Sequence, residues 1–533
     1  MTDSVPDAMR DLETPEDVEV TLTAPEPVGD PKLGVVVEVD RATTPRHRLV
    51  TIGDSITHGF QNGAVFNTDL SYPAIIAYEL GWYDQFRRPS YPGFGGLPIN
   101  IELLLHDLEE RFGAQLSFFE LPLALFRARQ FMDGVEDYYE RGPGSQVPAV
   151  TGVNHNLGIY GWDLRDVLER TFDSCQKEIR TPKDDLIAQL VENDNQRAAL
   201  RVLPSIPEPA RLLTPLGAAK ALGDEGTLEG QDGDGIETLI VLLGANNALG
   251  SVTELRVVWS GDGFDDLDRK KPLTVWRPTH FKAELTKLAA QVRQIRARHV
   301  IWGTVPHVTI APIARGVAGK VEPGSRYFPF YTRPWITDRD FNPRQDPHIT
   351  SQQARAVDSA IDQYNQAMTA IVRAARKRGK DWYLLDVAGL LDRLAARRYI
   401  EDPLARPEWW QPYDLPPQVA LLQPVPDSKF LTVGPEGRSS GGLFSLDGVH
   451  PTTVCYGILA QEFINVMRRA GVTFFLGDGK TPRADPVTVD FQRLVRRDTL
   501  ITNPPRALTA GLDVLRWGDE VLDIFRRTLS FNL

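Results

Sequence analysis

LVTIGDSITHG, from Leu49 to Gly59, is the stretch of sequence that decides the fold. It opens with an apolar, β-prone run, turns at Gly53-Asp54, and places Ser55 where a helix can begin. A serine on a tight strand-to-helix turn is exposed at the end of a sheet, and its own N–H lies at the positive end of the helix. The stretch therefore predicts a strand–turn–helix unit with Ser55 as a candidate nucleophile, although Gly-Asp-Ser by itself is also a common turn sequence.

Short apolar runs that predict buried strands alternate with helical patterns along the rest of the chain. Core strands are predicted at 147–154, 239–244, 300–305 and 382–387, and helices at 71–81, 101–108, 163–172, 281–295 and 351–378. Two peripheral strands are expected ahead of the core, at 18–23 and 34–39. This alternation is typical of an α/β fold, in which helices cover both faces of a parallel sheet.

Polar residues follow three of the predicted core strands. Ser55 follows the first, a loop ending at Gly161 follows the second, and Asn246 follows the third. Ligands of an open parallel sheet bind outside the carboxyl ends of its strands, so these residues are expected to share a site. Near the end of the chain, Asp447 and His450 are spaced so that one loop can carry a base and the carboxylate that orients it. The alternative is an aspartate helix cap beside a solvated histidine.

The other histidines are weaker candidates for a catalytic base. His47, His299 and His307 flank predicted strands and are expected to lack a nearby aspartate partner. His58 lies one turn beyond Ser55 and could border the pocket. It is too close in sequence to fold back as a well-aligned base, so a direct role for it remains only an alternative.

Four short blocks resemble, in order, the motifs of the GDSL, or SGNH, hydrolase family: GDSIT from Gly53 to Thr57, Gly161, Gly244-Ala-Asn246, and Asp447-x-x-His450-Pro451. Each block is common by itself, but all four in order on predicted strand ends form a specific pattern. The resemblance implies a flavodoxin-like three-layer α/β/α sandwich with a parallel sheet. It also implies that esters are hydrolysed through an acyl-enzyme.

The family resemblance also assigns roles to individual residues. It makes Ser55 the nucleophile, His450 the general base and Asp447 the carboxylate that orients the base. It implies an oxyanion hole formed by the backbone N–H groups of Ser55 and Gly161 and by the side-chain amide of Asn246.

The sequence departs from the family pattern in two ways. Asn247 stands where the family has aspartate, which affects the support of its neighbour more than the activity. Long insertions also separate the blocks. We expect a polar lead-in over residues 1–45, partly disordered or in peripheral strands, then a hydrolase domain over 46–475 with insertions near 82–146, 173–235, 311–350 and 400–440. A C-terminal extension over 476–533 is expected to dock an amphipathic helix at 508–529.

The expected substrate is a small-molecule or lipid ester. Six aromatic residues lie between Tyr327 and Phe341, and Tyr327, Phe330 and Trp335 are predicted to line an acyl pocket, with Asp54 as a further substrate-binding residue. These aromatics could equally pack an insertion onto the core. The expected activity is that of an esterase or lipase, with a carbohydrate O-deacetylase or an acyltransferase as alternatives. A catalytically silent binding module on the same scaffold is the alternative from another class.

Composition limits the partners and cofactors. A net charge of −12 without a basic stripe argues against nucleic acid. Two cysteines and no clustered ligands predict neither a disulfide framework, nor a metal site, nor a cofactor. Residues 1–20 are acidic and polar, and no run reaches the roughly 18 apolar residues of a membrane span. A cytoplasmic location without stable membrane insertion is therefore expected.

Overall fold

The structure is a computed structural model that describes residues 9–30, 44–115, 119–146, 152–181, 191–226, 235–434 and 436–506, together with residues 6, 33, 34, 37, 117 and 149. Five strands form a central sheet in the order β11–β7–β6–β1–β5, and every neighbouring pair is parallel. Their bounds are β1 His47–Gly53, β5 Asn156–Gly158, β6 Ile236–Leu242, β7 Ala297–Gly303 and β11 Trp382–Leu385. In chain order this is the flavodoxin-like 2-1-3-4-5 arrangement. It confirms the predicted α/β fold.

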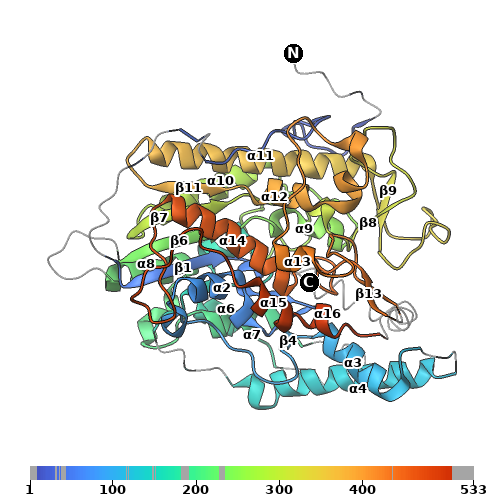
Figure 1. The fold of residues 1–533 in the computed structure, drawn as a ribbon, viewed down its shortest axis with the longest axis horizontal. Coiled ribbons are helices and arrows are strands. Elements are labelled where there is room, and N and C mark those ends of the chain that lie inside the picture. The colour runs from blue at the N-terminus through green and yellow to red at the C-terminus, as the bar shows by residue number, and fades with distance from the viewer. Residues whose placement is uncertain are drawn as a thin grey trace.

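Helices cover both faces of the sheet because successive strand residues point to opposite sides. Leu239 and Val241 of β6 join one core cluster, and Ile240 and Leu242 join the other. The first cluster also contains α5 (Leu164–Glu169), α8 (Pro215–Gly226), α10 (Pro278–Val292) and α11 (Ser351–Arg376), and the second α2 (Tyr72–Glu79), α12 (Val387–Leu394) and α14 (Thr453–Arg469). In Figure 1, α10 lies beside α11 and α2 lies below α14. The three predicted layers are therefore present.

The longest helix follows from its sequence pattern. Its N-cap is Thr350, whose hydroxyl accepts from the N–H of Gln353 while the Gln353 side chain accepts from the N–H of Thr350. One apolar face, including Val357, Ile361 and Tyr364, is fully buried. The helices predicted at 71–81, 281–295 and 351–378 are confirmed as α2, α10 and α11.

The second core strand lies later in the chain than predicted. It is Asn156–Gly158 rather than 147–154, of which the structure describes only a part. Asn156 is fully buried, so apolar patterning could not identify it. Its amide nitrogen donates to the carbonyl of Thr57, and its amide oxygen accepts from the N–H of Gly158. Gly158, predicted in a loop, therefore ends a strand.

Two further predictions differ from the structure. The segment 163–172 forms α5 and the start of α6 (Phe172–Glu178) rather than one helix, because Arg170 is extended between them. Residues 18–23 form no strand and instead pack beside α10 and α11. There, Asp17 accepts from Arg277 at 2.8 Å and the N–H of Glu19 donates to Gln363 at 2.9 Å. The helix predicted at 508–529 and most of the strand at 34–39 lie outside the described residues.

The remaining elements connect the core strands or extend beyond them. They are α1 Ser55–His58, β2 Phe60–Gln61, β3 Ala64–Val65, β4 Leu97–Pro98, α3 Ile101–Phe112, α4 Leu121–Glu140, α7 Asp194–Val202, α9 Asn246–Thr253, β8 Arg315–Val317, β9 Phe330–Thr332, β10 Ile349–Thr350, α13 Pro417–Ala420, β12 Thr432–Gly434, β13 Gly437–Ser440, α15 Phe491–Arg497 and α16 Thr499–Thr502. The helix α8, near the end of the predicted insertion 173–235, packs on β1 and thus belongs to the core layers.

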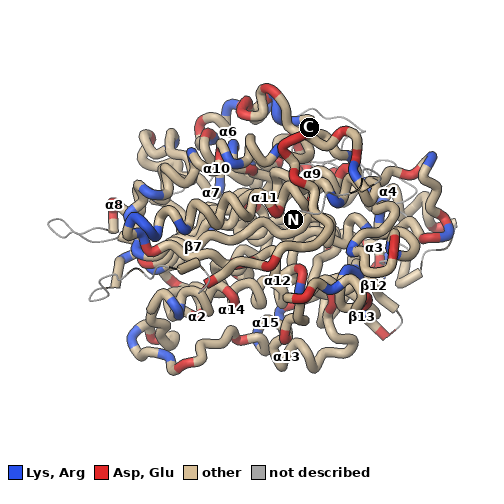
Figure 2. The backbone as a smooth tube through the Cα atoms, turned by 90° about the horizontal axis from the view of Figure 1, so that it is seen from above, with Lys and Arg blue, Asp and Glu red and all other residues tan. Residues whose placement is uncertain are grey.

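Charged residues of both signs cover the outside of the fold. In Figure 2, Lys and Arg positions are interspersed with Asp and Glu positions along the surface helices and loops. Within the described ranges, the structure contains no helix with the length and apolar character needed to cross a bilayer.

Candidate active site

The three predicted oxyanion-hole residues follow neighbouring strands of the sheet. Ser55 follows β1, Gly161 follows β5 and Asn246 follows β6, where the strand order reverses. This switch point is the usual ligand site of a doubly wound sheet. The turn before Ser55 requires glycine at position 53, because a Cβ there would lie 2.7 Å from the carbonyl oxygen of Leu242.

Ser55, His450 and Asp447 form one hydrogen-bonded chain. The Oγ of Ser55 lies 2.9 Å from Nε2 of His450, and Nδ1 of His450 lies 3.0 Å from Oδ2 of Asp447. All three residues are buried, at 3%, 1% and 0% exposure respectively. An imidazole held in this way can accept the serine proton at Nε2 while the carboxylate fixes the tautomer with the proton on Nδ1.

The carboxylate of Asp447 is held as an anion by four donors. Its Oδ1 accepts from the N–H groups of Val449 and His450, and its Oδ2 accepts from the N–H of Gly63 and from the imidazole. Burial by itself would raise the pKa of Asp447. The charge of His450 and these hydrogen bonds outweigh burial and lower the pKa, so the group stays ionised.

A small hairpin, which we did not predict from the sequence, holds the loop that carries Asp447 and His450. Its strands β2 and β3 are joined by Asn62 and Gly63. The N–H of Asn62 donates to Oγ of Ser445, and its Oδ1 accepts from the N–H of Leu446. Both turn residues have positive φ, 55° for Asn62 and 79° for Gly63. The Asn-Gly pair between apolar residues was a sequence signal for such a turn.

Donors for an oxyanion remain on the three residues that follow neighbouring strands of the sheet. Within the part of the chain that the structure describes, the N–H groups of Ser55 and Gly161 have no hydrogen-bond acceptor. The side-chain nitrogen of Asn246 donates to the carbonyl of Trp162 at 2.8 Å. Because an amide nitrogen carries two protons, a second donor remains on Asn246.

The loop that carries Gly161 is anchored on both sides. On one side, the Tyr160 hydroxyl donates to Asp194 at 2.7 Å and the Trp162 indole to Asn195 at 2.8 Å. On the other side, Asp163 caps α5 and accepts from the ammonium of Lys270 at 2.7 Å. These contacts hold the N–H of Gly161 in a fixed position.

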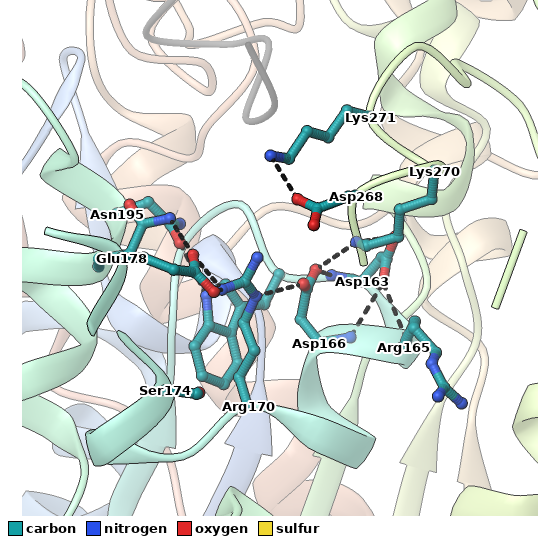
Figure 3. Close-up of polar contacts among 12 residues, drawn as sticks. Asp163, Arg165, Asp166, Arg170, Ser174, Glu178, Asn195, Asp268, Lys270 and Lys271 are labelled. Atoms are coloured by element: carbon teal, nitrogen blue, oxygen red, sulfur yellow. Dashed lines mark hydrogen bonds and ion pairs between the residues drawn. The ribbon is translucent and has the colours of Figure 1, made fainter. Parts of the chain in front are cut away.

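Lys270 is the centre of a buried ionic cluster behind this loop, which Figure 3 shows. Its Nζ lies 2.7 Å from a carboxylate oxygen of Asp163 and 2.7 Å from one of Asp166, and Arg170 binds the other oxygen of Asp166 at 2.7 Å. Burial would lower the pKa of Lys270, but the two carboxylates outweigh it and raise the pKa. The ammonium is therefore charged, and it compensates the two carboxylates that cap α5.

An apolar pocket of about 100 Å³ opens at Ser55 and His450. Its walls come from α12 (Leu390, Leu391, Leu394), from α14 (Cys455, Ile458, Leu459) and from the segment that contains Val308 and Ala311. The prediction that Tyr327, Phe330 and Trp335 line this pocket is wrong, since none of them is among its described lining residues.

These aromatic residues pack elsewhere. Tyr327 is fully buried with its ring 4.7 Å from the guanidinium carbon of Arg355, Phe330 packs on Phe341 at 5.4 Å between ring centroids, and Trp335 packs against the core. They hold an insertion on the core, which was the alternative interpretation of the pattern.

Asp54 does not line the pocket either. Its carboxylate caps α1 by accepting from the N–H of Ile56 at 3.1 Å. Burial raises the pKa of Asp54 to about 7, against the opposing effects of this hydrogen bond and of the charge of His450. The structure thus gives Asp54 a role in positioning Ser55.

His58 is held away from Ser55. Its Nδ1 accepts from the N–H of Tyr160 at 3.2 Å, so its Nε2 carries the proton and donates to the hydroxyl of Tyr91 at 2.7 Å. Burial lowers the pKa of His58 to about 3. This histidine is neutral and structural.

Two other histidines have aspartate partners that are distant in the chain. His299 pairs with Asp381 at 2.6 Å, and His307 lies 2.9 Å from Asp362 and 3.2 Å from Asp392. The expectation that these histidines lack an aspartate is therefore wrong. Burial would lower the pKa of His307, but the two carboxylates outweigh burial and raise it to about 10. His307 lines the pocket, yet both its nitrogens are engaged, so it has no free base.

The site combines a nucleophile, a base, an orienting carboxylate and free donors beside an apolar pocket. This combination suits attack of a serine on a carbonyl carbon. Among the described residues, no three His, Cys, Asp or Glu side chains are placed to hold a metal ion. Neither the models of known protein families nor the curated proteins contain a match to this sequence.

Proposed function

We propose that this protein is a serine hydrolase that cleaves carboxylic esters through an acyl-enzyme on Ser55. The chain from Ser55 to His450 to Asp447, with its distances of 2.9 and 3.0 Å, carries the proposal. The resemblance of the four sequence blocks to the GDSL, or SGNH, hydrolases supports it. Free donors beside the serine support it further, because a tetrahedral intermediate needs them.

In the proposed reaction, Oγ of Ser55 attacks the carbonyl carbon while Nε2 of His450 takes the hydroxyl proton. The negative charge that forms on the carbonyl oxygen is stabilised by the N–H groups of Ser55 and Gly161 and by the amide of Asn246. The C–O bond then breaks, and the imidazolium gives its proton to the leaving alkoxide. Water attacks the acyl-enzyme with His450 again as base, which releases the acid and restores the serine.

The pocket favours a short acyl group. A volume of about 100 Å³ is well below the roughly 300–1,000 Å³ of sites that hold drug-sized ligands. We therefore propose that the protein is an esterase for short-chain substrates rather than a lipase for long chains. An acetyl group would also fit, which keeps a carbohydrate O-deacetylase and an acyltransferase as alternatives. Both cysteines are free thiols, which supports a cytoplasmic location.

Covalent labelling tests whether the site is catalytic or a silent module. A fluorophosphonate phosphonylates serines that a neighbouring base activates, so the purified protein should gain one adduct, found by mass spectrometry on Ser55. Three assays then separate the candidate activities. Hydrolysis of p-nitrophenyl acetate tests for an esterase, and hydrolysis of an acetylated sugar tests for a deacetylase. Reaction of p-nitrophenyl acetate with an added alcohol acceptor tests for an acyltransferase. An unlabelled serine together with no turnover of any ester would reject the proposal.

The acyl-chain preference should change when the pocket is enlarged. Leu391 lines the pocket and is half-buried, so Leu391→Ala should admit longer chains with a modest loss of stability. Each additional buried methylene contributes about 0.8 kcal/mol, or roughly fourfold in kcat/KM. A series of p-nitrophenyl esters measures the shift. Trp335→Ala is the control, and it should leave the chain-length profile unchanged.

Asn246→Ala should lower kcat with little change in KM. An oxyanion exists only around the tetrahedral intermediate, so a donor aimed at it acts on the barrier and not on substrate binding. The expected loss is about 10²–10³ in kcat, roughly 3–4 kcal/mol. Asn246→Asp should be at least as harmful, because it places a carboxylate against the developing charge.

Asn247→Ala is the matched control for this pair of variants. Its side chain is fully buried, and neither of its polar atoms has a hydrogen-bond partner among the described residues. Its kcat should stay within about tenfold of wild type, or roughly 1.4 kcal/mol. If Asn246→Ala were harmless and Asn247→Ala reduced kcat strongly, Asn246 would not be the oxyanion donor.

A further inference from the structure

A second cavity, of about 350 Å³, lies beside the pocket at Ser55. The segment 308–312 separates the two, because Val308 and Ala311 line the pocket while Thr309, Ile310 and Pro312 line the cavity. Its other walls come from β8, from the residues around the start of β9 and from the chain just before β12. Unlike the pocket at Ser55, this cavity has the volume of a site for a complete small molecule.

The lining of the cavity has one sign of charge. It includes Arg315, Arg326, Arg397, Arg398 and Lys429, and no Asp or Glu is among its described lining residues. We call it the cationic cavity. Three of these side chains have carboxylate partners outside the lining: Arg315 binds Asp338 at 2.6 Å, Arg398 binds Asp358 at 2.9 Å and Lys429 binds Glu401 at 2.9 Å.

The other two cations have no carboxylate partner within the described residues. Arg397 donates to the carbonyl of Gly316 at 2.8 Å and lies over the ring of Phe328 at 4.6 Å. Burial, and then the neighbouring charge of Arg315, lower the pKa of Arg397. An anion in the cavity would relieve both effects.

Arg326 is the more deeply buried of these two cations. It is 4% exposed, and none of its three guanidinium nitrogens has a hydrogen-bond partner among the described residues. Burial would lower the pKa of Arg326, but the neighbouring tyrosines and the carboxylates of Asp362 and Asp358 outweigh burial and raise it, so the guanidinium stays charged. Its guanidinium carbon lies 5.1 Å from the centroid of the Tyr327 ring, and its N–H donors remain unused by the described residues.

The remaining lining is largely apolar and aromatic. Phe328, Tyr331 and Phe430 line the cavity together with Ile310, Pro312 and Pro334. Aromatic and aliphatic walls bind an apolar body, and a few charged groups then fix its orientation. The cavity therefore suits a molecule with an anionic head and a compact apolar or aromatic body.

We propose that the cationic cavity binds an organic phosphate monoester with a compact aromatic or apolar body. A phosphate monoester carries a charge of about −1.5 to −2 at neutral pH, which matches two guanidinium groups that form no ion pair within the described residues, whereas a carboxylate supplies one charge. Arginine also binds phosphate through two parallel hydrogen bonds. The proposal does not rest on the ester hydrolase activity.

Isothermal titration calorimetry of the full chain tests this site without using activity. Phenyl phosphate is the probe, benzoate tests the charge, inorganic phosphate tests the need for a body, and phenol tests the need for an anion. We expect saturable binding of phenyl phosphate, with the other three at least about tenfold weaker. No saturable heat up to about 10 mM phenyl phosphate, or equal binding of benzoate or inorganic phosphate, would overturn the proposal.

Substitutions then locate the binding site. Arg397→Gln should weaken phenyl phosphate by about tenfold or more, because it removes a charge-assisted pair of donors. Arg393→Gln is the matched control, since Arg393 also donates to a backbone carbonyl and lies over an aromatic ring, but outside the cavity. It should bind within about twofold of wild type. Arg326→Gln provides a second variant if Arg397→Gln does not fold. Unchanged binding in a folded arginine variant of the cavity would place the ligand elsewhere.

Discussion

Ser55→Ala should abolish ester hydrolysis while the protein remains folded. The substitution removes the attacking oxygen, and loss of the nucleophile lowers kcat of a serine hydrolase by roughly 10⁶. The cost in stability is small, because a methyl group fits where the hydroxyl was and only the hydrogen bond to His450 is lost. Such a bond contributes about 1 kcal/mol. Steady-state hydrolysis of p-nitrophenyl acetate and thermal unfolding, measured on one preparation, give both numbers.

Ser359→Ala is the matched control for this variant. Ser359 is also fully buried, and its hydroxyl accepts from the N–H of Thr21 at 3.1 Å, but it lies on α11 away from the triad. It should change stability by a similar amount and leave both hydrolysis and fluorophosphonate labelling intact. Wild-type turnover by a purified Ser55→Ala protein would contradict the assignment of the nucleophile.

The fold could be predicted because its core strands and helices carry local signals. The strand β6 contains the uninterrupted apolar run from Leu239 to Leu242, and α11 combines an apolar face with a capping box. The strand β5 lacked such a signal, since the buried amide of Asn156 satisfies its hydrogen bonds with groups distant in the chain. Burial of a polar residue is decided by these tertiary partners, which a single sequence does not reveal.

The pairing of a histidine with its carboxylate was predictable only where the two residues are close in the chain. Asp447 and His450 were found because they lie three positions apart, whereas His307 pairs with Asp362 on another element, 55 positions away. The pocket walls on α12 and α14 were missed for a different reason. Leu391 and Ile458 have the spacing of core residues, and the sequence does not distinguish an apolar face that is packed from one that borders a cavity.

Asp447→Asn should lower kcat by about 10⁴, the loss seen when a triad carboxylate elsewhere becomes an amide. Both oxygens of Asp447 already accept hydrogen bonds: Oδ1 from the N–H groups of Val449 and His450, and Oδ2 from the N–H of Gly63 and from the imidazole. An amide nitrogen at the Oδ1 position would therefore face two backbone donors. At the Oδ2 position it would face one backbone donor and force Nδ1 of His450 to become an acceptor.

The second orientation is the less costly, because it sets only one backbone donor against the amide. The proton of the imidazole then lies on Nε2 and points at Ser55. Because Nε2 is already protonated, it cannot accept the serine proton, so the variant should bind ester normally and fail to acylate. Asp381→Asn is the matched control, since Asp381 pairs with the buried His299 at 2.6 Å outside the site. It should lower stability and leave kcat unchanged. If both substitutions reduced kcat equally, the effect would be one of folding, and Asp447 would lose its role in orienting the base.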